Sequence, residues 1–117
     1  MSAGSDPARA PRVVLVTAPD AAAAASIARA LVEERLAACV NLVPGLRSIY
    51  RWQGRVEEAD EVLLLIKTVE GARAGIERLL ARVHPYDLPE CVALDVVGVE
   101  ARYLEWLVEG SGPAAGA

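Results

Sequence analysis

The stretch Glu61-Val62-Leu63-Leu64-Leu65-Ile66-Lys67-Thr68 decides the fold of this chain. Its middle is aliphatic at every position, as in strands that are buried on both faces of a sheet. Glu61 and Lys67 have the same parity along a strand, so their side chains project from one face and flank the apolar middle. The stretch therefore predicts a central strand of a sheet that is covered on both sides.

Two further segments, residues 13–17 and 92–97, also read as apolar strands. A sheet with one face in water would alternate apolar and polar residues, and these segments do not alternate along most of their length. Two main helices and a short closing helix cannot cover both faces of such a sheet. We therefore expect the second face to pack on something else, and the simplest candidate is another copy of the chain.

Three helices are expected between and after the strands. The first begins at Asp20, whose side chain can accept hydrogen bonds from free N–H groups, and runs to about Arg35. A short helix over residues 101–109, with Gly110 as its stop, closes the fold. The apolar stripes that define the two main helices are Ala24, Ile27, Ala28 and Leu31 in the first, and Ile76, Leu79, Leu80 and Val83 in the second.

A long hairpin lies between the two main helices. Residues 39–53 are expected to be extended, with a bulge or kink at Pro44-Gly45 and a turn at Gly54. Tyr50 and Trp52 are two positions apart, so they share a face of the hairpin, and both residue types are enriched at interface anchors. The hairpin therefore predicts an interface surface.

The order of elements is β-α-β-β-α-β followed by a helix. This order predicts the α+β class and a ferredoxin-like split βαβ sandwich with a C-terminal helix. We expect one domain over residues 12–109. Residues 1–11 and 110–117 are rich in Gly, Pro, Ser and Ala and are expected to be disordered tails.

Composition excludes several classes of protein. A net charge of −4 and the absence of a basic stripe argue against a nucleic-acid partner. No segment approaches the roughly 18 apolar residues of a membrane span, and residues 1–11 lack the apolar core of a secretory signal. The two cysteines, Cys39 and Cys91, form neither a metal-binding spacing nor a disulfide framework. We expect a cytoplasmic protein.

The segment His84-Pro85-Tyr86-Asp87-Leu88-Pro89-Glu90 contains the only histidine of the chain. Its two prolines stiffen the backbone, so an imidazole, a phenol and two carboxylates are presented on a rigid connection. One interpretation is a ligand site, in which His84 binds a divalent cation with oxygen donors beside it. The other is a rigid turn between helix and strand whose polar groups only cap and solvate the backbone.

The chain resembles the CutA family of small divalent-cation tolerance proteins over roughly residues 13–109. The matching segments are Thr17-Ala-Pro-Asp20, Leu36-Ala-Ala-Cys-Val-Asn-Leu-Val-Pro-Gly45, Ser48-Ile-Tyr-Arg-Trp-Gln-Gly54, Glu61 with Lys67-Thr68, and His84-Pro-Tyr86 with Pro89-Glu90. The resemblance implies a ferredoxin-like protomer, a tight homotrimer, polar residues at the clefts between subunits and a role in tolerance to copper and other divalent metals. Some members are described as binding copper through a cysteine before Thr-Ala-Pro and two histidines before Pro-Tyr. Here Val16 and Val83 occupy two of those three positions.

These arguments select His84 as the metal ligand and name a set of candidate residues for a cleft. That set is Tyr86, Glu90, Lys67, Glu61, Trp52, Tyr50 and Cys39. Some of these residues have a simpler interpretation. Cys39 is then a packing residue of a strand, and Glu61 and Lys67 lie at the solvated ends of a strand. With Val16 and Val83 at described ligand positions, copper binding is expected to be weak.

Three functional classes stay open. The first is a trimeric metal-tolerance or metal-response protein, with no obligatory cofactor and copper as a possible ligand. The second is a trimeric small-molecule sensor resembling the P-II signalling proteins, with its ligand in the cleft between subunits, although the chain has no Gly-rich phosphate cradle. The third is an enzyme, which we do not expect because the sequence contains no nucleophile motif and no dinucleotide fingerprint.

Overall fold

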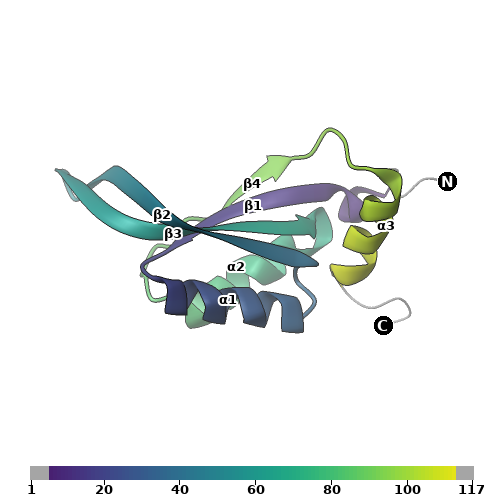
Figure 1. Cartoon of the computed structure of the whole chain (residues 1–117), viewed down its shortest axis with the longest axis horizontal. Helices are drawn as coiled ribbons and strands as arrows, with labels where there is room; N and C mark the ends of the chain where they lie inside the picture. The colour runs from purple at the N-terminus through teal and green to yellow at the C-terminus, as the bar shows by residue number, and fades with distance from the viewer. Residues whose placement is uncertain (1–5, 113–117) are drawn as a thin grey trace.

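A four-stranded antiparallel sheet with two helices on one face forms the body of the protein (Figure 1). The computed structural model describes residues 6–112. The strand order β2-β3-β1-β4 and the element order confirm the predicted ferredoxin-like fold. The elements are a 3-10 helix at Pro7–Arg9, β1 Pro11–Ala18, α1 Ala21–Glu33, β2 Cys39–Trp52, β3 Arg55–Val69, a 3-10 helix at Glu70–Ala72, α2 Arg73–Val83, β4 Val92–Asp95 and α3 Ala101–Gly110.

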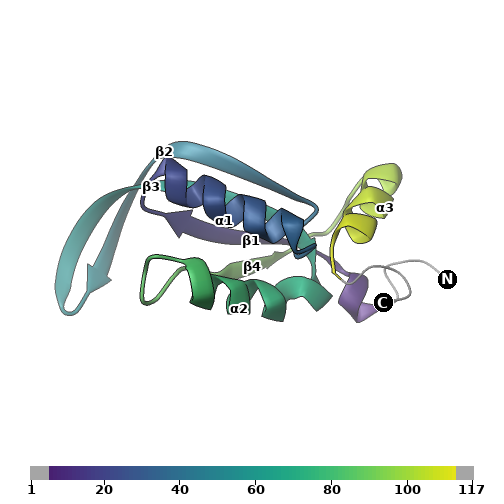
Figure 2. The same cartoon turned by 90° about the horizontal axis from the view of Figure 1, so that it is seen from below.

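The hydrophobic core lies between the sheet and the two main helices. Figure 2 shows α1 and α2 side by side on one face of the sheet, with α3 at one end. The fully buried side chains come from both layers and include Val14, Val16, Leu64 and Ile66 of the sheet and Ile27, Leu31, Ile76, Leu79 and Leu80 of the helices. Within residues 6–112, no helix has the length and apolar character needed to cross a membrane.

The helix predictions are close to the observed boundaries. Asp20 caps α1 by accepting a hydrogen bond from the Ala23 N–H at 2.8 Å, as expected. The helix ends at Glu33, because Arg35 has a left-handed φ of 60° that a helix cannot contain. In α2 the predicted apolar stripe is buried except for Val83, the last residue of the helix, which is 47% exposed.

The last strand is shorter than predicted. β4 ends at Asp95, which pairs with Arg12 of β1. One further residue pair would place Val96 opposite Pro11, which has no N–H to donate to the ladder. The predicted strand over residues 92–97 therefore stops two residues early, and Val97 is fully exposed.

Both predicted tails differ from the structure where it describes them. Asp6 accepts a hydrogen bond from the Ala8 N–H, and the Ala10 carbonyl accepts one from the Glu70 N–H, so residues 6–11 are ordered as a 3-10 helix and the start of β1. At the other end Gly110 belongs to α3, and the Gly112 N–H donates to the Arg35 carbonyl. The predictions of disorder for residues 1–5 and 113–117 lie outside the described residues.

The sheet face opposite the helices is apolar. Leu15, Leu63 and Leu65 are half-buried there, and Val92 and Leu94 are exposed. Figure 1 shows α1 and α2 on the other side of the sheet, and no helix of residues 6–112 runs along this open face. The central strands are therefore apolar on both faces, as the sequence predicts.

The hairpin β2–β3 extends beyond the rest of the sheet (Figure 1). Its strands pair as far as Trp52 and Arg55, and the turn residues Gln53 and Gly54 have φ of 51° and 81°. Two consecutive positive φ values match the turn that suits the twist of a hairpin. The register shifts between Val43 and Leu46, which confirms the predicted bulge at Pro44-Gly45.

We expect Gly54→Ala to lower the free energy of unfolding by ~1–2 kcal/mol, because a Cβ is disfavoured at a left-handed φ. Gly98→Ala is the matched control: both glycines have nothing within 4 Å of an added Cβ, and only Gly54 has a positive φ. Urea denaturation of both variants measures the difference. Equal stabilities would show that the turn relaxes to another geometry.

Candidate functional site

A pocket of about 780 Å³ lies where the hairpin meets the loop between α2 and β4. This size falls within the roughly 300–1,000 Å³ of small-ligand pockets. The lining residues come from β1, β2, β3 and that loop: Thr17, Ser48, Ile49, Tyr50, Trp52, Glu61, Pro85, Tyr86, Asp87, Leu88, Pro89 and Glu90. Thr17 and Glu61 have the same parity as Leu15 and Leu63, so the pocket lies at the end of the open face of the sheet.

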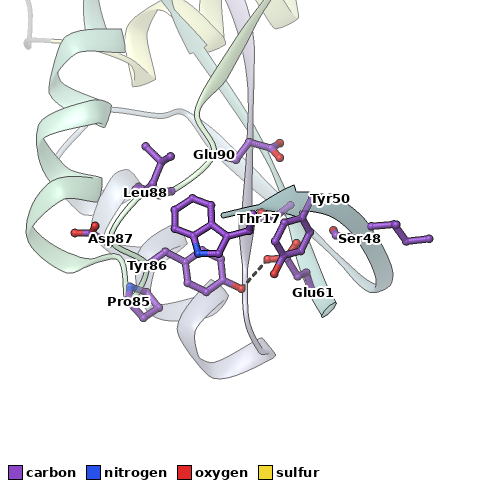
Figure 3. Close-up of a pocket in the computed structure, with 12 residues that line it drawn as sticks. Thr17, Ser48, Tyr50, Glu61, Pro85, Tyr86, Asp87, Leu88 and Glu90 are labelled. Atoms are coloured by element: carbon purple, nitrogen blue, oxygen red, sulfur yellow. Dashed lines mark hydrogen bonds between the residues drawn. The ribbon is translucent and has the colours of Figure 1, made fainter. Parts of the chain in front are cut away.

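Glu61 is the most buried charged residue of the pocket, with only 8% of its surface exposed. The Tyr86 hydroxyl donates a short hydrogen bond of 2.6 Å to Glu61 Oε2 (Figure 3). Among residues 6–112, no Lys, Arg or His side chain forms an ion pair with Glu61. The carboxylate is therefore held by a neutral donor from the loop, and its charge is uncompensated.

His84 fixes the start of the loop. It follows the last residue of α2, its backbone is extended because Pro85 comes next, and its side chain is buried. Its Nε2 lies 2.8 Å from the Thr17 carbonyl oxygen, and its Nδ1 accepts from the Tyr86 N–H at 3.0 Å. A carbonyl can only accept and an amide N–H can only donate. The imidazole is therefore neutral, with its proton on Nε2.

These two hydrogen bonds bear directly on the predicted metal ligand. A metal would need a free lone pair on the His84 ring, and the only one is already used by the Tyr86 N–H. That His84 is a metal ligand stays a prediction. Binding of a metal through Nδ1 would break the hydrogen bond from the Tyr86 N–H. Moreover, within residues 6–112 no group of three or more His, Cys, Asp or Glu side chains is placed to hold a metal ion. Residues 6–112 of a single chain therefore do not supply three such ligands to one ion.

The pocket is electrostatically negative. Glu61, Asp87 and Glu90 line it, and within residues 6–112 no Lys or Arg does. Burial and the neighbouring charge of Glu61 raise the pKa of Glu90. Figure 3 shows Asp87 pointing away from Glu61, so Glu61 and Glu90 dominate the charge of the pocket.

The phenol of Tyr86 is also perturbed. Burial raises its pKa well above the usual value, and the hydrogen bond to Glu61 and the negative charge of Glu61 raise it further. The neutral phenol is thus the stable form beside the carboxylate. Tyr86 therefore acts as a fixed hydrogen-bond donor.

The structure brings together most of the predicted cleft residues. Tyr50, Trp52, Glu61, Tyr86 and Glu90 all line the pocket, and His84, at the start of the loop, is hydrogen bonded to the Tyr86 N–H. The remaining two, Lys67 and Cys39, pair across β2 and β3 at the opposite end of the sheet. At roughly 3.3 Å per residue, Lys67 is about 20 Å from Glu61 along β3.

Thr17, Ser48 and Leu88 also belong to the pocket but were not predicted to do so. Thr17 contributes its backbone carbonyl to His84, and a carbonyl has no signature in a sequence. The available signal was the motif Thr17-Ala-Pro-Asp20, which ends β1 and starts α1 at this edge of the sheet.

Residues 12–110 match the family model of the CutA1 divalent ion tolerance proteins. The chain is 54% identical over 100 residues to the divalent-cation tolerance protein CutA of Thermus thermophilus, spanning 86% of this chain and 97% of that protein. It is 47% identical over 95 residues to the protein of the same name in Pectobacterium atrosepticum, spanning 81% and 86%. The structure of CutA1 from Oryza sativa is similar with a TM-score of 0.86 at 40% identity, over 90% of this chain and 96% of that one.

Because the pKa of Tyr86 is raised, the folded protein keeps this proton above pH ~10, where the unfolded chain releases it. The resulting stabilisation is complete below pH ~10 and is lost as pH rises through the folded pKa. We expect the ultraviolet absorbance of tyrosinate to show a late step that Tyr86→Phe removes and the control Tyr103→Phe retains. A titration without a late step would mean that Tyr86 is solvated.

Proposed function

Because the chain belongs to the CutA1 family of divalent ion tolerance proteins, we propose that it acts as a homotrimer in the response to divalent cations and binds copper weakly at or near the clefts between subunits. The observation that carries the cation proposal is the buried Glu61, in a pocket that residues 6–112 line with further carboxylates and without a Lys or Arg side chain. A negative, partly enclosed cleft concentrates cations. The cytoplasmic location of the protein stays a prediction.

The open face of the sheet supports association. Leu63 and Leu65 of β3 and Leu94 of β4 form an apolar surface that residues 6–112 leave partly in water. The sheet also has two different free edges, β2 and β4. An interface that joins unlike surfaces forms a closed ring when its rotation closes, and the trimer is the ring that the family resemblance implies.

Oxygen donors fit the proposed copper site better than nitrogen. Glu61 and Glu90 are close enough for the charge of Glu61 to shift the pKa of Glu90, whereas the ring nitrogens of His84 are both hydrogen bonded. Two carboxylates without an imidazole or thiolate form a weak site for copper. His84 supports the site by positioning Tyr86, and its own role as a ligand stays the prediction from the sequence, which requires the Tyr86 N–H to release Nδ1.

A small-molecule sensor is the second candidate. The observation that favours it is the composition of the pocket wall, which includes Tyr50, Trp52, Ile49 and Leu88 as well as the carboxylates. Ligand pockets typically combine such apolar and aromatic walls with few polar groups.

We expect sedimentation equilibrium to give about three times the chain mass of 12.4 kDa at micromolar concentration. Leu63→Glu should shift the protein to monomer, because it places a charge on the apolar open face. Val32→Glu is the control, on an exposed apolar residue of α1. A clean monomer for the unaltered protein would refute the trimer.

We expect calorimetric titration with Cu²⁺ to show weak binding that Glu61→Gln weakens about tenfold, a change of ~1.4 kcal/mol. Glu105→Gln, on exposed α3, is the control for nonspecific charge. His84→Ala is titrated in parallel after a thermal melt has shown that it is folded. If His84→Ala abolishes binding and electron paramagnetic resonance of the unaltered protein shows nitrogen coupling to copper, then His84 is a ligand and our oxygen assignment is wrong.

A further inference from the structure

We propose that the pocket at Glu61 binds a small organic ammonium ion, namely a protonated primary amine with an apolar stem. This inference concerns a metal-free ligand, so it goes beyond the proposed response to divalent cations. It rests on an uncompensated buried carboxylate, on the aromatic walls around it and on the sign of the charge in the pocket.

The buried carboxylate is the first observation. Glu61 is more than nine-tenths buried and faces the pocket, yet the only hydrogen bond to its carboxylate within residues 6–112 is the one from Tyr86 to Oε2. Carboxylates are rarely buried to this extent without a cationic partner, because desolvation of the charge is costly. The second oxygen, Oε1, is thus available to a donor that enters the pocket.

The aromatic walls are the second observation. Tyr50 and Trp52 project from the same face of β2, and both line the pocket with roughly half of their surface exposed. Figure 3 shows Tyr50 on one side of the Glu61 carboxylate and Tyr86 on the other. Aromatic faces attract cations and also cover apolar stems.

The sign of the charge excludes the opposite class of ligand. A carboxylate or phosphate ligand would meet Glu61 and Glu90, and no Lys or Arg of the described chain, residues 6–112, lines the pocket to compensate for its charge. The negative charge of the pocket is also seen in the raised pKa of Glu90, which reflects partial burial and repulsion from Glu61. An ammonium group can donate to Glu61, and its positive charge relieves the repulsion between Glu61 and Glu90.

An ammonium ion also fits better than a tightly held metal ion. Residues 6–112 contain no group of three or more His, Cys, Asp or Glu side chains placed to ligate one ion. An ammonium group needs only hydrogen-bond acceptors, and its attached stem gains from burial at about 25 cal/mol per Å² of apolar surface. The carboxylates of the pocket supply the acceptors, and its aromatic and aliphatic side chains bury the stem.

The test uses three probes that share one stem: n-hexylammonium chloride, 1-hexanol and sodium hexanoate. Each is titrated into the full chain in EDTA, so that no metal contributes, and binding is followed by calorimetry and by amide chemical shifts. We expect n-hexylammonium to bind at least tenfold more tightly than 1-hexanol, hexanoate not to bind, and the shifts to gather at Tyr50, Trp52 and Tyr86. Glu61→Gln should lose at least tenfold in affinity, while the control Glu105→Gln should lose nothing.

Three results would overturn the proposal. Equal affinity for n-hexylammonium and 1-hexanol would mean that the pocket recognises only apolar surface, and tighter binding of hexanoate would mean an anion site. Binding that appears only in Lys67→Met would mean that Lys67 of a second copy fills the pocket. Because copper is absent throughout, failure here leaves the copper titration to decide the divalent-cation proposal independently.

Discussion

β3 is the constraint on which the rest of the structure depends. It pairs with β2 on one side and with β1 on the other, and it is apolar on both faces between Glu61 and Lys67. One face, with Leu64 and Ile66, is buried by α1 and α2. The other face contributes Leu63 and Leu65 to the open side of the sheet. A single strand therefore contributes both to the hydrophobic core and to the apolar open face of the sheet.

A chain of hydrogen bonds connects this strand to the rest of the site. The Thr17 carbonyl at the end of β1 accepts from His84, the His84 ring accepts from the Tyr86 N–H, and the Tyr86 hydroxyl donates to Glu61. The direction of each hydrogen bond is fixed. A carbonyl on one side of the His84 ring and an amide N–H on the other allow only the neutral form with its proton on Nε2. The loop between α2 and β4 is thus fixed to β1 and β3, and His84 acts as its central link.

The sequence predicted the parts of the structure that follow from periodicity and turn chemistry. The element order, the cap at Asp20, the bulge at Pro44-Gly45 and the turn at Gly54 are all as expected, since local residues determine them. The early end of β4 depends on Pro11, which is far away in sequence and adjacent only through strand pairing. The pairing register, which no local pattern encodes, decides such features.

In the site, too, the sequence predicts what residue type determines and misses what the three-dimensional arrangement determines. The sequence identified the aromatic and acidic residues of the pocket by their type, but it grouped Lys67 with Glu61 because the two share a strand face. Parity places side chains on a face and says nothing of the distance between them along the strand. Likewise, the single histidine of the chain, in a rigid loop, suggests a metal ligand. Its hydrogen-bond partners are a backbone carbonyl and a backbone N–H, and no residue type in the sequence identifies such partners.

The position of the pocket links its chemistry to assembly. Glu61 and Leu63 project from the same face of β3, so a ligand at Glu61 and a second copy on the open face would contact neighbouring side chains. A copy that approaches this edge removes water from the pocket, and an uncompensated Glu61 then becomes more costly. A cation in the pocket offsets that cost. By thermodynamic reciprocity, cation binding and subunit association are therefore expected to strengthen each other.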